Sequence, residues 1–213
     1  MRIGVFDSGV GGKAVAEKLA ELLPDAEIVS IDDHEHVPYG TRPNEEIIAL
    51  TDAAIQPLLD NSCDAIVIAC NTATTIAIRH LRAKYPSTSF IGIEPMVKSA
   101  ASMTKTGKIA VLATPSTLQS ERYQELKQTW AKNTTVIEPD CSAWASMIES
   151  GSSDAIDIYS VVNPLIESGV DVIVLGCTHY HLIKKRVVET AGNVAVILEP
   201  TDAIANRISS LVK

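Results

Sequence analysis

Short apolar segments alternate with amphipathic segments along the whole chain, and this alternation constrains the fold more than any other feature. Buried strands are predicted at residues 3–6, 27–31, 65–69, 90–93, 108–113, 135–137, 172–175 and 194–198. Helices are predicted at residues 13–23, 45–59, 74–85, 118–130, 155–168, 181–190 and 202–213. Strands that alternate with helices form βαβ units, so we expect an α/β protein with parallel sheets flanked by helices.

An internal repeat adds a second constraint. Residues 63–70 align with residues 170–177 without a gap, and both segments end in a cysteine, Cys70 and Cys177. The first apolar segments of the two halves, residues 3–6 and 109–112, align at nearly the same offset. We therefore expect two pseudo-symmetric lobes that arose by duplication.

Charge and composition exclude several classes of function. The formal net charge of −8 argues against sequence-independent binding of nucleic acid. No apolar segment reaches the ~18–20 residues that cross a bilayer, and the N-terminus lacks the layout of a signal peptide, so we expect a cytoplasmic protein. The 4 cysteines show no zinc-ligand spacing, so we expect free thiols and no metal.

Cys70 and Cys177 each stand where a predicted strand is followed by a helix. Ligands of parallel α/β sheets bind at these strand ends, and the N–H groups of a helix start are expected to lower the pKa of a thiol there. The alternative is that a buried cysteine is merely a small apolar side chain, the role that we expect for Cys63 and Cys141.

If the two halves are related by a pseudo-twofold axis, the sulfurs of Cys70 and Cys177 face each other across a cleft. Such a pair can racemise an amino acid, because one thiolate removes the α-proton while the opposite thiol donates another. The sulfurs are then expected roughly 6–7 Å apart. Asp7 and His179 are candidates for tuning these thiols. Asp7 as a turn cap and His179 as a solvent-exposed side chain are the alternatives.

Hydroxyl and amide side chains gather at the same strand ends. They can bind the carboxylate or ammonium of a substrate, or simply cap helices. These residues are Ser8, Asn71, Thr72, Thr114, Thr117 and Thr178. Residues 38–42 are expected to form a turn that carries Tyr39 and Arg42.

Residues 9–14 also imitate a dinucleotide-binding loop, with Asp32 at the end of the next strand. The Asp7 carboxylate beside the expected pyrophosphate position makes that reading unfavourable, and the chain offers no second site for a hydride acceptor.

The chain resembles the glutamate racemase family in four ordered segments that span nearly its whole length. These segments are residues 6–12, 37–42, 69–74 and 176–180. The resemblance implies an isomerase that interconverts L- and D-glutamate without a cofactor and supplies D-glutamate for peptidoglycan. It implies one lobe of residues 1–96 and 198–213 and another of residues 97–197, with the active site at their interface, and it allows a homodimer.

The resemblance also implies roles for individual residues. It makes Cys70 and Cys177 the acid/bases, with Asp7 and His179 assisting, and it adds Glu149 as a further catalytic residue. The positions that it assigns to substrate binding are Ser8, Pro38, Tyr39, Gly40, Asn71, Thr72, Thr114, Thr117 and Thr178. Arg42 belongs to the motif, but we do not expect it to be a ligand.

Three alternatives stay open. A sister racemase would act on aspartate or another amino acid. A decarboxylase of the same superfamily would need only one such cysteine. A catalytically silent binding protein could retain this fold.

Overall fold

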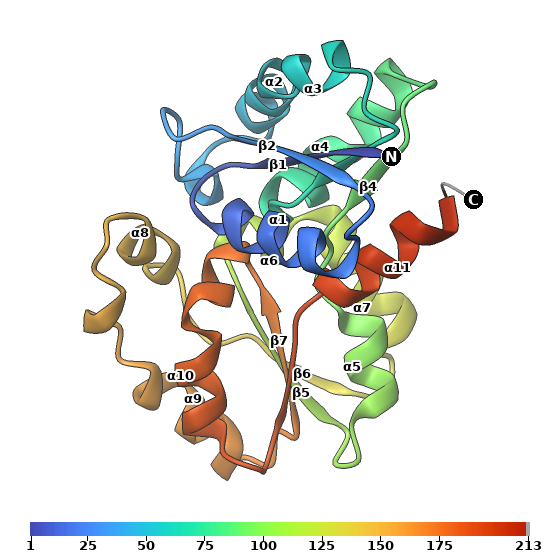
Figure 1. Cartoon of the computed structure of the whole chain (residues 1–213). Coiled ribbons are helices and arrows are strands. Elements are labelled where there is room, and N and C mark those ends of the chain that lie inside the picture. The colour runs from blue at the N-terminus through green and yellow to red at the C-terminus, as the bar shows by residue number, and fades with distance from the viewer. Residues whose placement is uncertain (212–213) are drawn as a thin grey trace. The chain divides into compact units, whose positions relative to one another are not determined.

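The computed structural model describes residues 1–211, so the last two positions of the predicted C-terminal helix and of the first predicted lobe lie outside the described residues. Contacts between residues divide the chain into two compact units (Figure 1). Unit 1 comprises Met1–Glu94 and the described chain from Pro200 onward, and unit 2 comprises Pro95–Glu199. The domain boundaries expected from the sequence stay a prediction.

Unit 1 is built on a four-stranded parallel sheet in the order β2-β1-β3-β4. Its strands are β1 (Arg2–Asp7), β2 (Glu27–Asp32), β3 (Ala65–Ile68) and β4 (Phe90–Gly92). The two central strands are buried on both faces, which explains why they consist of uninterrupted apolar residues. The sequence prediction of a parallel sheet is confirmed.

Helices cover both faces of the sheet in unit 1. They are α1 (Gly11–Leu22), α2 (Asn44–Ala54), α3 (Gln56–Asp60), α4 (Asn71–Lys84) and α11 (Thr201–Leu211), with a short 3-10 helix η1 (Tyr39–Thr41). Val15 of α1 and Ile208 of α11 pack on one face of the sheet, against Val5 and Val67. The other face of the sheet presents Phe6, Ile66 and Ile68, and it is covered by α2, α3 and α4.

Unit 2 repeats the same plan with a sheet in the order β6-β5-β7-β8, again parallel throughout. Its strands are β5 (Lys108–Ala113), β6 (Thr135–Ile137), β7 (Val172–Gly176) and β8 (Val196–Leu198). Counted within each unit, both sheets place their strands in the order second, first, third, fourth. This shared order agrees with the internal repeat in the sequence.

The helices of unit 2 are α5 (Val97–Met103), α6 (Pro115–Gln119), α7 (Glu121–Trp130), α8 (Trp144–Glu149), α9 (Ile158–Glu167) and α10 (Lys184–Ala191). Two 3-10 helices, η2 (Ser153–Ala155) and η3 (Thr178–Ile183), complete it. α5 and α7 pack on one face of the sheet. Figure 1 draws α9 and α10 beside each other on the opposite side.

Two predicted long helices are interrupted, and the prediction of single helices there was wrong. Residues 45–59 form α2 and α3 with a break at Ile55, and residues 118–130 fall into α6 and α7 with a break at Ser120. Ser120 has an extended backbone, and its hydroxyl accepts a hydrogen bond from the N–H of Tyr123, so it caps a new helix. The predictions also missed α5 and α8, which are short.

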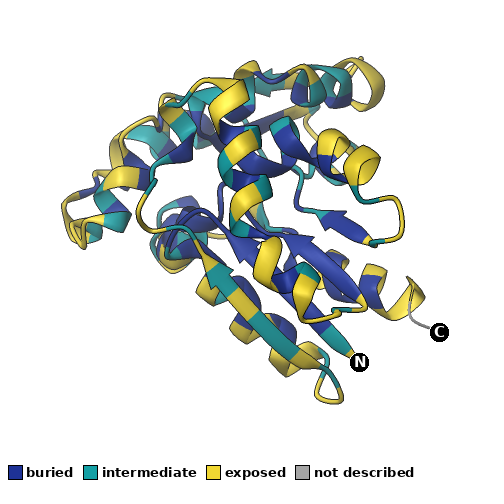
Figure 2. Cartoon of the chain, turned by 90° about the horizontal axis from the view of Figure 1, so that it is seen from above, coloured by how far each residue is buried: buried dark blue, intermediate teal, exposed yellow. Residues whose placement is uncertain are grey.

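Burial follows these layers in each unit. Figure 2 shows the strands mostly dark blue, while many helices carry yellow on the side that faces solvent. No helix within residues 1–211 is long and apolar enough to cross a membrane.

Candidate functional site

The strand order places one switch point in each unit. From the first strand the chain turns to one side for the second strand and to the other side for the third, so crevices open between β1 and β3 and between β5 and β7. β1 ends at Asp7, and Cys70 follows β3. In unit 2, Thr114 follows β5 and Cys177 follows β7. The residues singled out in the sequence therefore lie at the two positions where this fold binds ligands.

Cys70 sits at the N-terminus of α4 with an extended backbone. Its sulfur accepts hydrogen bonds from the Ser8 hydroxyl at 3.2 Å and from the N–H of Ala73 at 3.4 Å. The residue is only 6% exposed. The strand β1 and the helix α4 together hold this thiol in a fixed orientation at the switch point.

The pKa of Cys70 is raised from its usual 9 to about 11. Burial is the largest cause, because it disfavours the charged thiolate, and the negative charge of Asp7 is the next. Hydrogen bonds from Ser8 and from the N–H groups of Ala73 and Thr72 oppose the shift. The expectation of a net lowered pKa was wrong for Cys70: the helix start acts in the predicted direction but is outweighed.

Asp7 is fully buried at the end of β1, and its carboxylate accepts a hydrogen bond of 2.8 Å from the N–H of Gly9. The helix α1 approaches this side chain so closely that a Cβ on Gly12 would lie 2.3 Å from the Cβ of Asp7. Only glycine permits that approach. The glycine-rich segment thus packs a helix against a carboxylate, which argues against the dinucleotide-binding alternative.

Asn71 carries an unsatisfied polar atom beside the Cys70 junction. Its amide nitrogen donates to the carbonyl of Ile93 at 3.1 Å, while its Oδ1 has no hydrogen-bond partner among the described residues. Asn71 is only 2% exposed. A buried acceptor without a partner is costly, so this oxygen is suited to receive a donor from a ligand.

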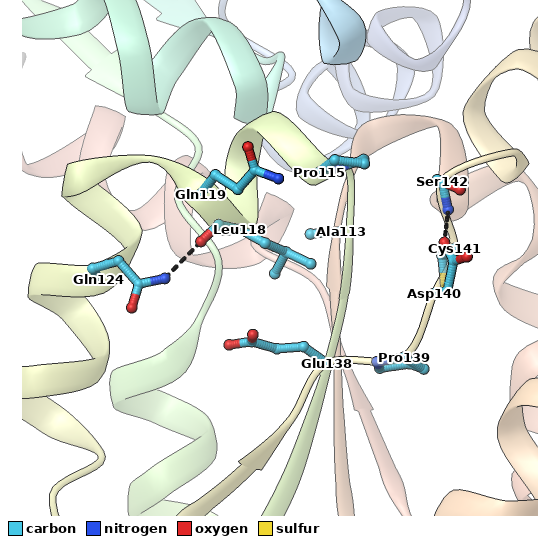
Figure 3. Close-up of a pocket in the computed structure, with 10 residues that line it drawn as sticks. All are labelled: Ala113, Pro115, Leu118, Gln119, Gln124, Glu138, Pro139, Asp140, Cys141 and Ser142. Atoms are coloured by element: carbon cyan, nitrogen blue, oxygen red, sulfur yellow. Dashed lines mark hydrogen bonds between the residues drawn. The ribbon is translucent and has the colours of Figure 1, made fainter.

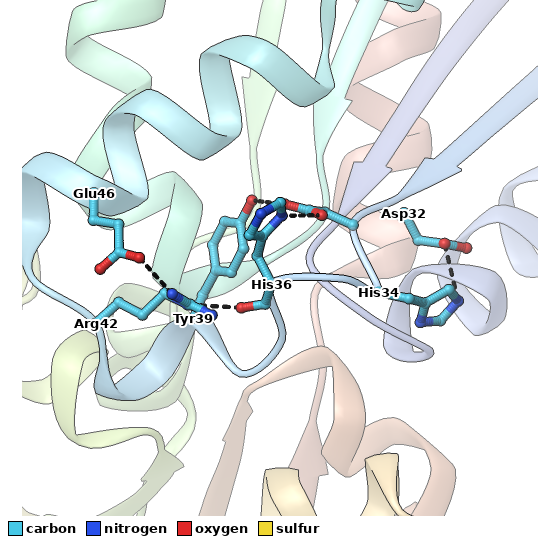
Figure 4. Close-up of polar contacts among 7 residues, drawn as sticks. Asp32, His34, His36, Tyr39, Arg42 and Glu46 are labelled. Carbon is cyan, nitrogen blue, oxygen red and sulfur yellow. Dashed lines mark hydrogen bonds and ion pairs between the residues drawn. The ribbon is translucent and has the colours of Figure 1, made fainter.

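Tyr39, at the start of η1, is 1% exposed and belongs to the same apolar cluster as Cys70. Its hydroxyl donates a 2.7 Å hydrogen bond to Asp33. Arg42 donates to the carbonyl of His36 at 2.7 Å and pairs with Glu46, as Figure 4 shows. Arg42 therefore braces the turn of residues 38–42, and Pro38 and Gly40 flank the buried Tyr39.

In unit 2, His179 connects Cys177 with Glu149, and both His179 and Glu149 are predicted catalytic residues. The Nδ1 atom of His179 is 3.8 Å from the Cys177 sulfur, and the Nε2 atom of His179 is 2.6 Å from a carboxylate oxygen of Glu149. Cys177 is 7% exposed and His179 is 4% exposed. The three side chains form a chain of proton-handling groups from thiol to imidazole to carboxylate.

The segment after Cys177 differs from the prediction of an α-helix over residues 181–190. Residues 178–183 form the 3-10 helix η3, and α10 begins only at Lys184. Tyr180 fixes this segment, because its hydroxyl donates to the carbonyl of Cys141 and its ring meets Trp144 of α8 edge-on. η3 is thereby tied to the elements that carry Glu149.

The hydroxyl residues of unit 2 are buried near the same strand ends. The hydroxyls of Thr114 and Thr117 are 3.1 Å apart, and Thr178 is 1% exposed. All 4 cysteines are free thiols. Cys141 is buried, and burial raises its pKa to about 12, which suits the inert role predicted for it.

A hollow of about 390 Å³ lies beyond the ends of β5 and β6 (Figure 3). Its lining includes Leu118, Gln119, Gln124, Glu138 and Asp140, and it contains none of the predicted site residues. Glu138 is already engaged by Tyr123 and Lys127. Among the described residues no group of three or more His, Cys, Asp or Glu side chains is arranged to hold a metal.

The sequence did not single out how the site is supported. The sequence-based predictions assign no role to Asp33, Tyr180 or Trp144. The position of Asp33 after β2 was the available signal. The contacts of Tyr180 and Trp144 join segments far apart in the sequence, so no local pattern reveals them.

Comparison with known proteins gives one consistent result. Residues 3–208 match the family described as Asp/Glu/Hydantoin racemase. The glutamate racemase of Herpetosiphon aurantiacus is 39% identical over 216 residues, an alignment that covers 99% of this chain and 84% of that protein.

Two solved structures are similar over almost the whole chain. One is Escherichia coli glutamate racemase in complex with L-glutamate and the activator UDP-MurNAc-Ala, with a TM-score of 0.86, 26% identity and coverage of 99% and 81%. The other is glutamate racemase from Aquifex pyrophilus, with a TM-score of 0.80, 34% identity and coverage of 100% and 84%.

Proposed function

This chain belongs to the Asp/Glu/hydantoin racemase family, and from that premise we propose that it is an isomerase that interconverts L-glutamate and D-glutamate without a cofactor. The observation that carries the proposal is the repeated junction. A buried cysteine follows the third strand of each sheet, and each cysteine has a proton-accepting partner of its own, Asp7 for Cys70 and His179 for Cys177.

Inversion needs two acid/bases, because the proton leaves one face of the α-carbon and another arrives on the opposite face. In the proposed reaction one sulfur removes the α-proton as a thiolate, and the other sulfur donates its thiol proton. The roles are exchanged for the reverse direction. We expect the two sulfurs to lie roughly 6–7 Å apart around the α-carbon.

Asp7 and His179 explain how each thiol loses and regains its proton. Cys70 rests as a neutral thiol because its pKa is raised, so it is poised to donate a proton, and the nearby Asp7 carboxylate can accept that proton when Cys70 must act as base. For Cys177, the imidazole of His179 can take the proton, and Glu149 stabilises the resulting imidazolium at 2.6 Å.

The remaining predicted residues are proposed to bind the substrate. The unpartnered Oδ1 of Asn71 suits the α-ammonium group, and Thr72 and Thr178, with Thr114 and Thr117, supply donors for carboxylates. Ser8 is proposed to contact both Cys70 and the substrate, and Pro38, Tyr39 and Gly40 to form one wall. Glutamate is favoured as the substrate by the full-length similarity to glutamate racemases.

The test is hydrogen exchange at the α-carbon. L-Glutamate incubated with the protein in D2O should lose its α-hydrogen and move towards the racemic mixture, and Cys70→Ala and Cys177→Ala should each abolish racemisation. Exchange with aspartate alone would assign the chain to a sister racemase. No exchange with either amino acid would favour a silent binding protein.

Location and assembly are part of the same proposal. D-Glutamate made in the cytoplasm would supply peptidoglycan synthesis, and we expect a homodimer. Light scattering after size-exclusion chromatography measures the assembly directly.

A further inference from the structure

Asp33, in the loop between β2 and η1, is held by several polar contacts. The hydroxyl of Tyr39 donates to one oxygen of Asp33 at 2.7 Å, and the Nδ1 atom of His36 lies 2.8 Å from the other oxygen. The N–H of Asp33 donates to the carbonyl of Asp7 at 3.2 Å. The Asp33 side chain is only 12% exposed. Asp33 thus connects the end of β1 with Tyr39.

Tyr39 transmits this connection to the Cys70 junction. Its ring is 6.4 Å from the ring of Phe6, centroid to centroid, and both side chains belong to the apolar cluster that contains Cys70. The phenol is buried, so its hydroxyl needs an acceptor. The Asp33 carboxylate supplies one, and a charged acceptor makes the bond stronger than a neutral one would.

We propose that Asp33 is a positioning residue for the reaction: it holds Tyr39, and with it the segment of residues 38–40, at the Cys70 junction. The proposal rests on the proposed racemase function, since the segment 38–40 is expected to contact the substrate. Asp33 acts through Tyr39 and not on the reacting atoms, so its loss should weaken substrate binding more than it slows proton transfer.

The adjacent residue Asp32 provides a matched control. Its side chain is 43% exposed and pairs at 2.9 Å with His34, which is itself 52% exposed. Figure 4 shows the Asp32–His34 pair apart from His36 and Tyr39. Asp32→Ala removes a carboxylate from the neighbouring position, the last residue of β2, whose side chain pairs with His34 and not with Tyr39.

The experiment measures KM and kcat for glutamate racemisation in Asp33→Ala, Asp33→Asn, Tyr39→Phe and Asp32→Ala. Asp33→Ala should raise KM about tenfold while kcat falls by less than about threefold, because an interaction made equally before and during the reaction is lost. Asp33→Asn keeps an oxygen for the Tyr39 hydroxyl and should recover most of the loss. Asp32→Ala should stay within about twofold of the unaltered protein.

A double-mutant cycle tests the connection itself. Adding Tyr39→Phe to Asp33→Ala should raise KM no further than the worse single change, since each change removes the same hydrogen bond. Tyr39→Phe removes the same hydrogen bond without altering Asp33 and should also raise KM, so it keeps the test decisive if Asp33→Ala does not fold.

Two failures are distinguishable. An unaltered protein that does not racemise glutamate refutes the proposed function. An active protein whose KM is unchanged by Asp33→Ala, or shifts equally in Asp32→Ala, refutes the role of Asp33 alone, and additive effects of Asp33 and Tyr39 changes also refute it.

Discussion

The raised pKa of Cys70 leads to a quantitative prediction for Asp7→Asn. A pKa of about 11 instead of 9 corresponds to a preference for the neutral thiol of about 3 kcal/mol. At pH 8 about one Cys70 in a thousand is then a thiolate, against about one in ten for an ordinary cysteine. Because only the thiolate is alkylated, Cys70 should react slowly with iodoacetamide, and its rate should rise tenfold per pH unit.

Asp7→Asn removes the second-largest cause of the shift and leaves the largest, burial, in place. The pKa of Cys70 should therefore fall, and the rate of alkylation at pH 8 should rise.

The assay is alkylation between pH 7 and 10, quantified by mass spectrometry of the peptide that contains Cys70. Asp25→Asn, at an exposed carboxylate in the turn after α1, serves as the control and should leave the profile unchanged. A plateau below pH 9 in the unaltered protein, or an Asp7→Asn profile that does not move, would refute this account of the Cys70 environment.

Three further predictions follow from single contacts. Burial lowers the pKa of His181 from 6.5 to about 4, so the folded protein keeps this imidazole neutral and loses stability as the pH falls from 6.5 towards 4. In urea unfolding, His181→Leu should shrink the difference in unfolding free energy between pH 7.5 and pH 4.5 by about 2.5 kcal/mol. Glu149→Gln should lower kcat by roughly ten- to hundredfold with little change in KM, because the imidazolium of His179 loses its counter-charge. An unchanged kcat would exclude proton transfer through His179 and Glu149. Gly12→Ala should lower the free energy of unfolding in urea by about 1–3 kcal/mol, because the added Cβ clashes with Asp7. Alanine in place of glycine within a helix otherwise raises stability by up to about 1 kcal/mol, so the sign of the change in unfolding free energy tests the clash.

The sequence predicted the class of fold because buried parallel strands read as continuous apolar segments. It placed all eight strands of the two sheets within a few residues of their observed bounds. The sequence did not predict the helix breaks at Ile55 and Ser120, because an amphipathic pattern continues across each break.

The strand-end position of Cys70 and Cys177 was readable from the repeat alone. The net direction of the Cys70 pKa was not, since burial and the charge of Asp7 depend on packing between β1, β3 and α1. The hydrogen bond between Asp33 and Tyr39 joins residues only six apart in the sequence. Its strength depends on the burial of the Tyr39 ring against Phe6, which the local sequence does not show.

The central claim is that two thiols act on opposite faces of one carbon, and α-hydrogen exchange in the single cysteine variants tests it most directly. Cys70→Ala and Cys177→Ala should both lose racemisation by at least about a hundredfold, the usual contribution of a general acid or base. Any residual exchange in D2O should be confined to one enantiomer of glutamate in one variant and to the other enantiomer in the other, because each retains one base. Racemisation that persists in either variant, or exchange of the same enantiomer by both, would contradict the two-thiol account.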